Sequence, residues 1–406
     1  MIPNLPWRRT KRRGLRLWPV GTALALAFAA AIAVASAAFL AGWDLLGAQG
    51  LKPEHRIDSK TLFDLVKLSF GVVAGAGALV ALVVAYRRQR VNEDGALRDA
   101  TRLHTERFTT AVSQLGEESA AVRLGGVHAL AGLADDAPTR DLRQTCIDVL
   151  CAYLRLPYTA ETLILPEGAE ALHAYRALRE ARHTIIRLIR DHLRLALDHP
   201  HSWQGHDFDF TGAVFDGGNF DGAEFSGGTV SFRGAEFSSG TVGFVRAVFS
   251  GGHVDFTRTN FTGGSVQFGH AEFRSGRVSF PLAEFSGGKV SFFHARFLGG
   301  TVDFDRALFL RGTVRFSYAT FSGGVVGFPG AKFSGAEVDF SKAVGVAPPG
   351  LVPSDGQPLP AGLTLPDSWH PIAPPPLASD TPTASGTSQP DATHIVIDDQ
   401  PPAQDS

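Results

Sequence analysis

Cysteine and histidine are the side chains of this 406-residue sequence that are best suited to metal binding or nucleophilic chemistry. The two cysteines, Cys146 and Cys151, are five residues apart on a predicted helix, which points them about 140° apart around its axis. No His or Cys spacing matches a zinc site, so the sequence predicts no cofactor, no metal site and no catalytic residue. We expect buried thiols and solvated or hydrogen-bonded histidines in the first half of the chain, namely His104, His128, His173, His183 and His192.

Two long uncharged stretches predict transmembrane helices at residues 17–43 and 68–86. They contain 27 and 19 residues, close to the roughly 20 that cross a hydrocarbon core. The second stretch contains Gly71, Gly75 and Gly77, but no strand precedes them, as a nucleotide-binding loop would require. Close packing of one membrane helix on another explains these glycines better.

Basic residues flank the pair of stretches on its outer sides, so the positive-inside rule places residues 1–16 and everything from residue 87 in the cytoplasm. Residues 44–67 then form an external loop of a protein with two spans in the plasma membrane. Ala35-Ser36-Ala37 also resembles a signal-peptide cleavage site, and that alternative keeps the main body cytoplasmic because the second stretch stops transfer. The topology determinants are Arg8, Arg9, Lys11, Arg12, Arg13, Arg16, Arg87, Arg88 and Arg90.

Residues 87–200 have apolar side chains at three- and four-residue spacings, which predicts a small all-α juxtamembrane block. Gly116, the stretch from Asp135 to Pro138, and the stretch from Pro157 to Pro166 should interrupt it. The expected helices cover about 95–115, 118–134, 139–156 and 168–197.

Phenylalanine carries the strongest pattern, with 25 of the 30 between Phe208 and Phe340. From Phe225 the intervals alternate between seven and five, which gives a twelve-residue repeat in ten copies with the consensus F-S-G-G-T-V-x-F-x-x-A-x. Val-x-Phe and Ala-x-Phe each place two apolar residues on one face of a short strand, while a residue between them, such as Ser279, points outward. Each copy must stack on its neighbours to bury that face, so residues 205–344 are expected to form a solenoid.

The repeat assigns two sets of structural residues. Glycine at the third place after the first Phe predicts a corner with positive φ. The expected corner glycines are Gly228, Gly240, Gly252, Gly264, Gly276, Gly288, Gly300, Gly312 and Gly324. The expected core ladder is Phe232, Phe237, Phe244, Phe249, Phe256, Phe261, Phe268, Phe273, Phe280, Phe285, Phe292, Phe297, Phe304, Phe309, Phe316, Phe321, Phe328, Phe333 and Phe340.

The units Ala213-Val214-Phe215-Asp216-Gly217 and Ala223-Glu224-Phe225-Ser226-Gly227 resemble the five-residue unit of the pentapeptide-repeat family. The resemblance implies a right-handed, four-sided β-helix. Two extra residues in alternate units would give 24 residues per turn, and a two-sided coil of twelve residues remains an alternative. The segments RFTTAVSQLGEESAAVRLGGVHALAGLAD and SWQGHDFDFTGAVFDGGNF resemble the juxtamembrane region of actinobacterial pentapeptide-repeat membrane proteins.

Charge separates the functions that this resemblance implies. Residues 205–345 contain 13 Asp and Glu against 12 Lys and Arg, which argues against a DNA-mimic regulator of topoisomerase and against nucleic-acid binding. We expect a non-catalytic, membrane-anchored scaffold whose solenoid contacts an unidentified protein partner, with the lipid bilayer as its other partner. An unrecognised enzyme and the DNA mimic are the alternatives, and the oligomeric state stays open.

The last segment, residues 345–406, contains 14 of the 24 prolines of the chain and neither Lys nor Arg. This composition, without an apolar period, predicts a Pro-rich disordered tail. Its one hydrophobic island runs from His394 through Ile395, Val396 and Ile397 to Asp399, and could act as a short docking peptide.

Overall fold

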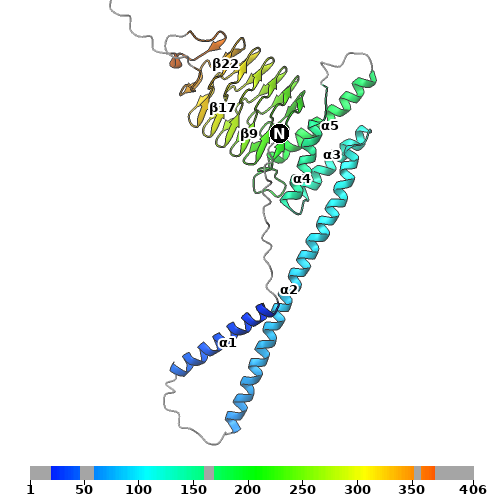
Figure 1. Ribbon diagram of the computed structural model, residues 1–406, viewed down its shortest axis with the longest axis vertical. Helices are drawn as coiled ribbons and strands as arrows, with labels where there is room; N and C mark the ends of the chain where they lie inside the picture. Colours follow the sequence, from blue (N-terminus) through cyan, green and yellow to red (C-terminus); the bar gives the residue numbers. More distant parts are fainter. Residues whose placement is uncertain (1–19, 46–58, 160–168, 352–357, 371–406) are drawn as a thin grey trace, which may run out of the picture.

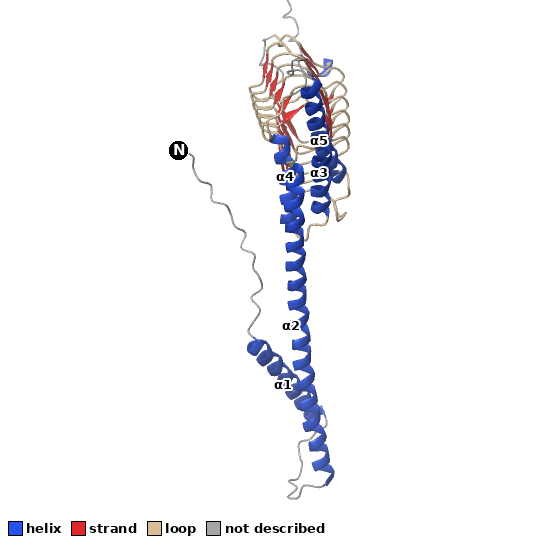
Figure 2. Cartoon of the chain, turned by 90° about the vertical axis from the view of Figure 1, so that its right-hand side faces the viewer, coloured by secondary structure: helices blue, strands red, loops and turns tan. Residues whose placement is uncertain are grey.

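The structure is a computed structural model, and it describes residues 20–45, 59–159, 169–351 and 358–370. A long helix connects an N-terminal helix to a small helical block, and that block lies against one end of a β-solenoid (Figure 1). In the view of Figure 2, the long helix extends well away from the solenoid and carries the N-terminal helix near its far end.

Helix α1 covers Val20–Leu45 and helix α2 covers Ser59–Leu115. The two helices lie against each other where Phe28, Ile32 and Ser36 of α1 meet the segment of α2 from Val72 to Leu79. With 57 residues, α2 is about 86 Å long at 1.5 Å per residue.

The unbroken length of α2 differs from the sequence prediction. Residues 44–67 were expected to form an external loop, but α2 already begins at Ser59. Residues 95–115 were expected to be a separate helix, but they continue the same one. Between Ser59 and Leu115 the sequence has no proline, and the isolated Gly95 costs only about 1 kcal/mol in a helix, which is too little to end it.

Three further helices form the block beside the solenoid: α3 (Ala120–Asp135), α4 (Arg140–Arg155) and α5 (Ala169–Leu193). Helix α3 packs on the end of α2 at Gly126, where an added Cβ would lie 2.5 Å from the Leu115 nitrogen. Thr139 caps α4 by accepting a hydrogen bond from the Leu142 amide. Both cysteines are buried in this core, together with Ile185 and Ile189 of α5.

The solenoid has four sides, each a parallel sheet to which every coil contributes one strand. Sheet A consists of β1 (Phe208–Asp209), β5 (Thr229–Ser231), β9 (His253–Asp255), β13 (Arg277–Ser279), β17 (Thr301–Asp303) and β21 (Val325–Gly327). Sheet B consists of β2 (Val214–Phe215), β6 (Glu236–Phe237), β10 (Asn260–Phe261), β14 (Glu284–Phe285), β18 (Leu308–Phe309) and β22 (Lys332–Phe333).

The other two sides are built in the same way. Sheet C consists of β3 (Gly218–Asn219), β7 (Thr241–Gly243), β11 (Ser265–Gln267), β15 (Lys289–Ser291), β19 (Thr313–Arg315), β23 (Glu337–Asp339) and β25 (Leu363–Thr364). Sheet D consists of β4 (Glu224–Phe225), β8 (Val248–Phe249), β12 (Glu272–Phe273), β16 (Arg296–Phe297), β20 (Thr320–Phe321) and β24 (Val344–Gly345).

The register decides between the two coil lengths that the sequence left open. Val230 pairs with Val254, and Val254 pairs with Val278, so each partner stands two repeats farther along the chain. The first coil is slightly shorter, since its Phe208 pairs with Val230. The twelve-residue repeat is therefore half a turn, and the longer of the two predicted coils is confirmed.

The phenylalanines form four stacks inside the coils, and every ring of the expected ladder is buried except Phe333, which is partly buried. Within a stack the ring centroids lie close together, 4.6 Å apart for Phe256 and Phe280 and 4.7 Å for Phe268 and Phe292. Rings of different stacks meet edge to face, as Phe280 and Phe292 do at 83°. Both arrangements are favourable for aromatic pairs.

Two kinds of corner turn the chain. All nine corner glycines expected from the repeat have positive φ, between 63° and 81°. The other corner, one residue before the Ala position of each repeat, also has positive φ but accepts side chains, for example Arg258, Leu282 and Tyr318. Space explains the difference: a Cβ at Gly240 would lie 2.3 Å from the Asp216 carbonyl oxygen, whereas one at Gly234 meets nothing within 4 Å.

Two further expectations need correction. Ser279 was expected to point to solvent, but its side chain is covered by His253, whose Nε2 lies 2.8 Å from its Oγ, and it is only 3% exposed. The segment from residue 345 was expected to be disordered throughout, but Leu363–Thr364 adds a strand to sheet C and a 3₁₀ helix, η2, covers Asp367–Trp369. Residues 352–357 and 371–406 lie outside the described part.

Alanine substitutions at Gly234 and Gly240 should separate backbone strain from contact between coils. Both glycines have nearly equal φ, 61° and 63°, so each variant bears the left-handed penalty of about 1–2 kcal/mol. Gly240→Ala should cost about 2–5 kcal/mol because the coils must also move apart. Denaturant unfolding measures both variants, and equal losses of unfolding free energy would show that contact between coils does not restrict this corner.

Candidate functional site

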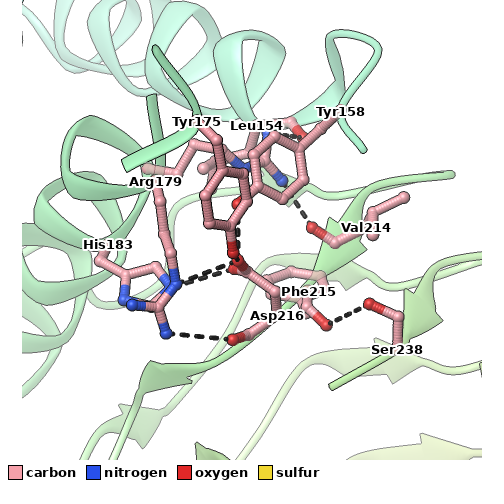
Figure 3. A network of polar contacts seen from close by, with 10 residues as sticks. Leu154, Tyr158, Tyr175, Arg179, His183, Val214, Phe215, Asp216 and Ser238 are labelled. Atoms are coloured by element: carbon pink, nitrogen blue, oxygen red, sulfur yellow. Dashed lines mark hydrogen bonds and ion pairs between the residues drawn. The ribbon is translucent and has the colours of Figure 1, made fainter. Parts of the chain in front are cut away.

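A buried carboxylate, Asp216, lies where the first coil turns from sheet B toward sheet C, and side chains of the helical block converge on it (Figure 3). The Tyr158 and Tyr175 hydroxyls each donate to its Oδ2 at 2.5 Å. Arg179 Nε donates to the same oxygen, and His183 Nε2 lies beside Oδ1, both at 3.1 Å. We call these five side chains the Asp216 clasp.

The clasp keeps its carboxylate ionised and its phenols neutral. Burial alone would raise the pKa of Asp216, but the hydrogen bonds from His183, Tyr158 and Tyr175 outweigh it and lower the pKa well below the ordinary value. Burial and the hydrogen bond to Asp216 both raise the pKa of Tyr158, and they have the same effect on Tyr175.

Arg182, which stands between Arg179 and His183 on α5, also connects the helical block to the first coil. Its guanidinium donates to the Leu154 carbonyl at the end of α4, at 2.8 Å, and to the Val214 carbonyl in β2, at 2.6 Å. The Tyr158 ring covers the guanidinium at 4.1 Å. Burial lowers the pKa of Arg182, yet arginine stays charged in proteins. One buried cation therefore links α4, α5 and the first coil.

A groove of about 510 Å³ lies beside the clasp, between α5 and sheet C. Gly217 and Gly218 allow α5 to approach closely, since a Cβ on Gly218 would lie 2.9 Å from Ile186 Cδ1. The wall on α5 consists of Arg179, Glu180, His183, Thr184, Arg187 and Arg190. The floor consists of Gly217, Gly218, Asn219, Asp221, Thr241, Gly243, Val245 and Gln267.

Charged and polar side chains line this groove. The Asp216 carboxylate is only 3% exposed and accepts from four side chains, so it does not present a free base or nucleophile to the groove. Of the three arginines in the wall, Arg179 pairs with Asp216 and Arg190 pairs with Asp191. Arg187 makes no ion pair within the described part of the chain, and a guanidinium of this kind favours an anionic group. Among the described residues no group of three or more His, Cys, Asp or Glu is placed to hold a metal ion.

The structure places the sequence-selected histidines and cysteines in the helical block. His183 belongs to the clasp, His192 contacts Asp135 at 3.1 Å, and His104 lies 3.0 Å from the Leu133 carbonyl. His128 and His173 are exposed. Burial raises the pKa of Cys146 to about 11 and also raises that of Cys151, which disfavours the reactive thiolate in both.

Of the topology determinants, Arg87, Arg88 and Arg90 lie on α2 directly after its apolar stretch. The N-terminal determinants, from Arg8 to Arg16, fall outside the described residues. Among the described residues, one helix is long and apolar enough to cross a membrane, within Leu62–Leu115.

Residues 210–260 match the family described as pentapeptide repeats (9 copies). These residues of the solenoid are pentapeptide repeats. The same four sheets continue beyond the matched residues to β21, β22, β23 and β24. No curated protein and no solved structure was found to match the chain.

Sequence reasoning missed the Asp216 clasp. A weak signal was present: Asp216 stands directly after Phe215 and before Gly217-Gly218, where most repeats have Ser. Its partners lie 33 to 58 residues away in a region without a repeat, so no spacing connected them to it. The carboxylate of Asp216, at a turn in the coil that follows the helical block along the chain, was the only hint of such a contact.

The clasp gives the protein an acid-sensitive contribution to stability. Asp216→Asn removes the charge and should cost about 2–4 kcal/mol at neutral pH. Since the folded-state pKa of Asp216 lies below the unfolded value of about 3.9, the unfolded chain takes up the proton first on acidification. The stabilisation is therefore complete above about pH 5 and is lost progressively as the pH falls through about 4.

Tryptophan fluorescence during denaturant unfolding at pH 7 and pH 3 measures this effect, since most of the loss occurs below the unfolded-state pKa. Asp305→Asn is the matched control, because that carboxylate is 41% exposed on the solenoid surface. The wild-type protein should lose more stability between the two pH values than Asp216→Asn does. Identical pH dependence in both would contradict the assignment of the clasp.

Proposed function

We propose that the chain is a non-catalytic, membrane-anchored scaffold whose pentapeptide-repeat solenoid binds a protein partner in the cytoplasm. The observation that carries the anchoring is the exposure of the apolar part of α2. Phe70 is 71% exposed, and Leu68 and Val73 are each 69% exposed. A continuous apolar surface of this kind is stable in lipid and unfavourable in water.

The orientation of the anchor rests on charge. Arg87, Arg88 and Arg90 follow the apolar stretch on the side that leads to the solenoid, which favours a cytoplasmic solenoid. From Arg87 to Leu115 the same helix continues without a break, over a length of about 44 Å. The solenoid is thereby held away from the bilayer, with its surface accessible to a partner.

The groove beside the Asp216 clasp is the best candidate for the contact. It places the guanidinium of Arg187, which makes no ion pair within the described part of the chain, above a floor of small and polar residues, and this suits an acidic side chain of a partner protein. On the outer surface of the solenoid, Arg233 pairs with Asp255 and Arg277 pairs with Asp303. Such pairs also weaken the alternative of a DNA mimic, which needs an unbroken row of negative charge.

The anchoring is tested by labelling single cysteine reporters in intact cells. Gly50→Cys, between α1 and α2, should react with an impermeant maleimide from outside. Ser379→Cys, beyond the solenoid, should react only after the cells are opened. The buried native cysteines, 0% and 1% exposed, provide a low background. Labelling of both reporters from outside would contradict the cytoplasmic solenoid.

The binding role is tested by proximity labelling from a C-terminal fusion in living cells. Arg187 lies on the groove wall and is exposed, so Arg187→Glu should leave the fold intact and reduce labelling of a groove-bound protein by about tenfold or more. Arg176→Glu is the matched control, since it makes the same charge change on an exposed part of α5 outside the groove. Equal labelling patterns for both variants would contradict a partner in the groove.

A further inference from the structure

The last coil of the solenoid breaks a regular series of hydrogen bonds in sheet A. In four successive coils the first residue of the strand donates its amide to the corner glycine one coil earlier: His253 to Gly228, Arg277 to Gly252, Thr301 to Gly276 and Val325 to Gly300, at 2.8 to 3.0 Å. In the last coil the chain is two residues shorter at this corner: Phe328 donates its amide to the Pro349 carbonyl, 21 residues farther on, whereas Phe304 donates to Gly327, 23 residues farther on. Pro349 therefore stands opposite Gly327, and the donor position of the series is skipped. The Gly324 carbonyl therefore lacks this bond, and among the described residues no other backbone amide donates to it.

An apolar groove of about 290 Å³ opens at this break, between the segment 322–326 and the segment 346–349. Val325 is 61% exposed and Val346 is 82% exposed. The outward position of Val325 is occupied by Thr229, His253, Arg277 and Thr301 in the other coils, so it becomes apolar only at this end. An exposed apolar strand edge of this kind is unfavourable in water unless something covers it.

The tail of the chain starts beside this groove. The Trp369 ring packs on Phe321, which lines the groove, with 5.5 Å between ring centroids. Its Nε1 also donates to the Gly345 carbonyl at 2.9 Å. The hydrophobic island begins at His394, and a random-coil chain as long as the one from His370 to His394 spans about 27 Å. The island is therefore held near the groove at high effective concentration.

We propose that residues 394–398 of the chain's own tail bind in this groove as an extended segment along the uncovered corner 322–326. Alternation along an extended segment places Ile395 and Ile397 on one face, toward Val325 and Val346, and Val396 on the other. A backbone amide of this segment replaces the missing donor to the Gly324 carbonyl. This inference is independent of the proposed function, and it gives the solenoid a cap built from its own sequence.

Disulfide formation in the full chain tests the proposal. The double variant Val325→Cys with Ile397→Cys places one thiol at the groove and one on the island. Val325→Cys with Ser388→Cys is the matched control, because Ser388 is closer along the chain to Trp369 and would meet the groove at least as often in an unbound tail. Under mild oxidation we expect the first pair to close within one chain about fivefold faster or more.

Three results would overturn the proposal. One is closure of the Ser388 pair as fast as the Ile397 pair, which indicates an unbound tail. Another is disulfide formation only between chains, which indicates that a second copy covers the groove. The third is a closure rate unaffected by the added change Ile395→Ser, which should slow the Ile397 pair to the rate of the control.

Discussion

The stacking distance of the coils is the constraint on which the rest of the structure depends. Parallel backbone hydrogen bonds fix neighbouring coils at strand spacing, and the stacked phenylalanine rings lie at nearly the same separation, 4.6 Å for Phe280 and Phe304. At the corner before sheets A and C, this spacing leaves no room for a side chain, so Gly240 and its equivalents must be glycine. At the other corner the chain bends outward, and arginine, leucine or tyrosine fits there despite positive φ. The interior residues and the glycine corner are thus fixed, whereas the second corner and the outward positions are free to vary.

A stack of coils has two ends, and the protein covers them in different ways. At the first coil, α4 and α5 lie over the solenoid, and they are held there by the ion pair of Asp216 with Arg179 and by the hydrogen bonds that Arg182 donates to backbone carbonyls. Trp203 continues this junction, fully buried, with its Nε1 donating to Asp135 and its ring stacked on His192 at 4.1 Å. At the last coil the cover is lighter, consisting of β25 and Trp369. The helical block is therefore part of the solenoid's folding unit, because without it the edges of β1 and β3 would be open.

Periodicity explains which features the sequence predicted. The phenylalanine stacks and corner glycines recur every twelve residues, so they followed from local spacing alone. The coil length did not, because a twelve-residue period fits both a half turn and a full turn, and only the pairing of Val230 with Val254 separates them. The Asp216 clasp, the cover over Ser279 and the order around Trp369 depend on contacts between segments without a common repeat. The continuity of α2 was missed for a different reason, since the change from apolar to charged composition at Arg87 marks a change of surroundings and not the end of a helix.

The groove beside the Asp216 clasp lies between the helical block and the solenoid, which the sequence presents as separate units. Its wall belongs to α5 and its floor to the first coils of sheet C with their adjoining turns, so the groove has a defined shape only while the clasp holds these units together. The same block receives the end of α2, where Ala111 and Leu115 are buried against α3. A displacement of α2 would therefore disturb α3, and α3 also contacts α5. Packed cores shift between discrete arrangements and do not stretch continuously, so the position of α2 and the shape of the groove depend on the same packed core. In contrast to the surface farther along the solenoid, the groove at this junction has a geometry that depends on the placement of α2.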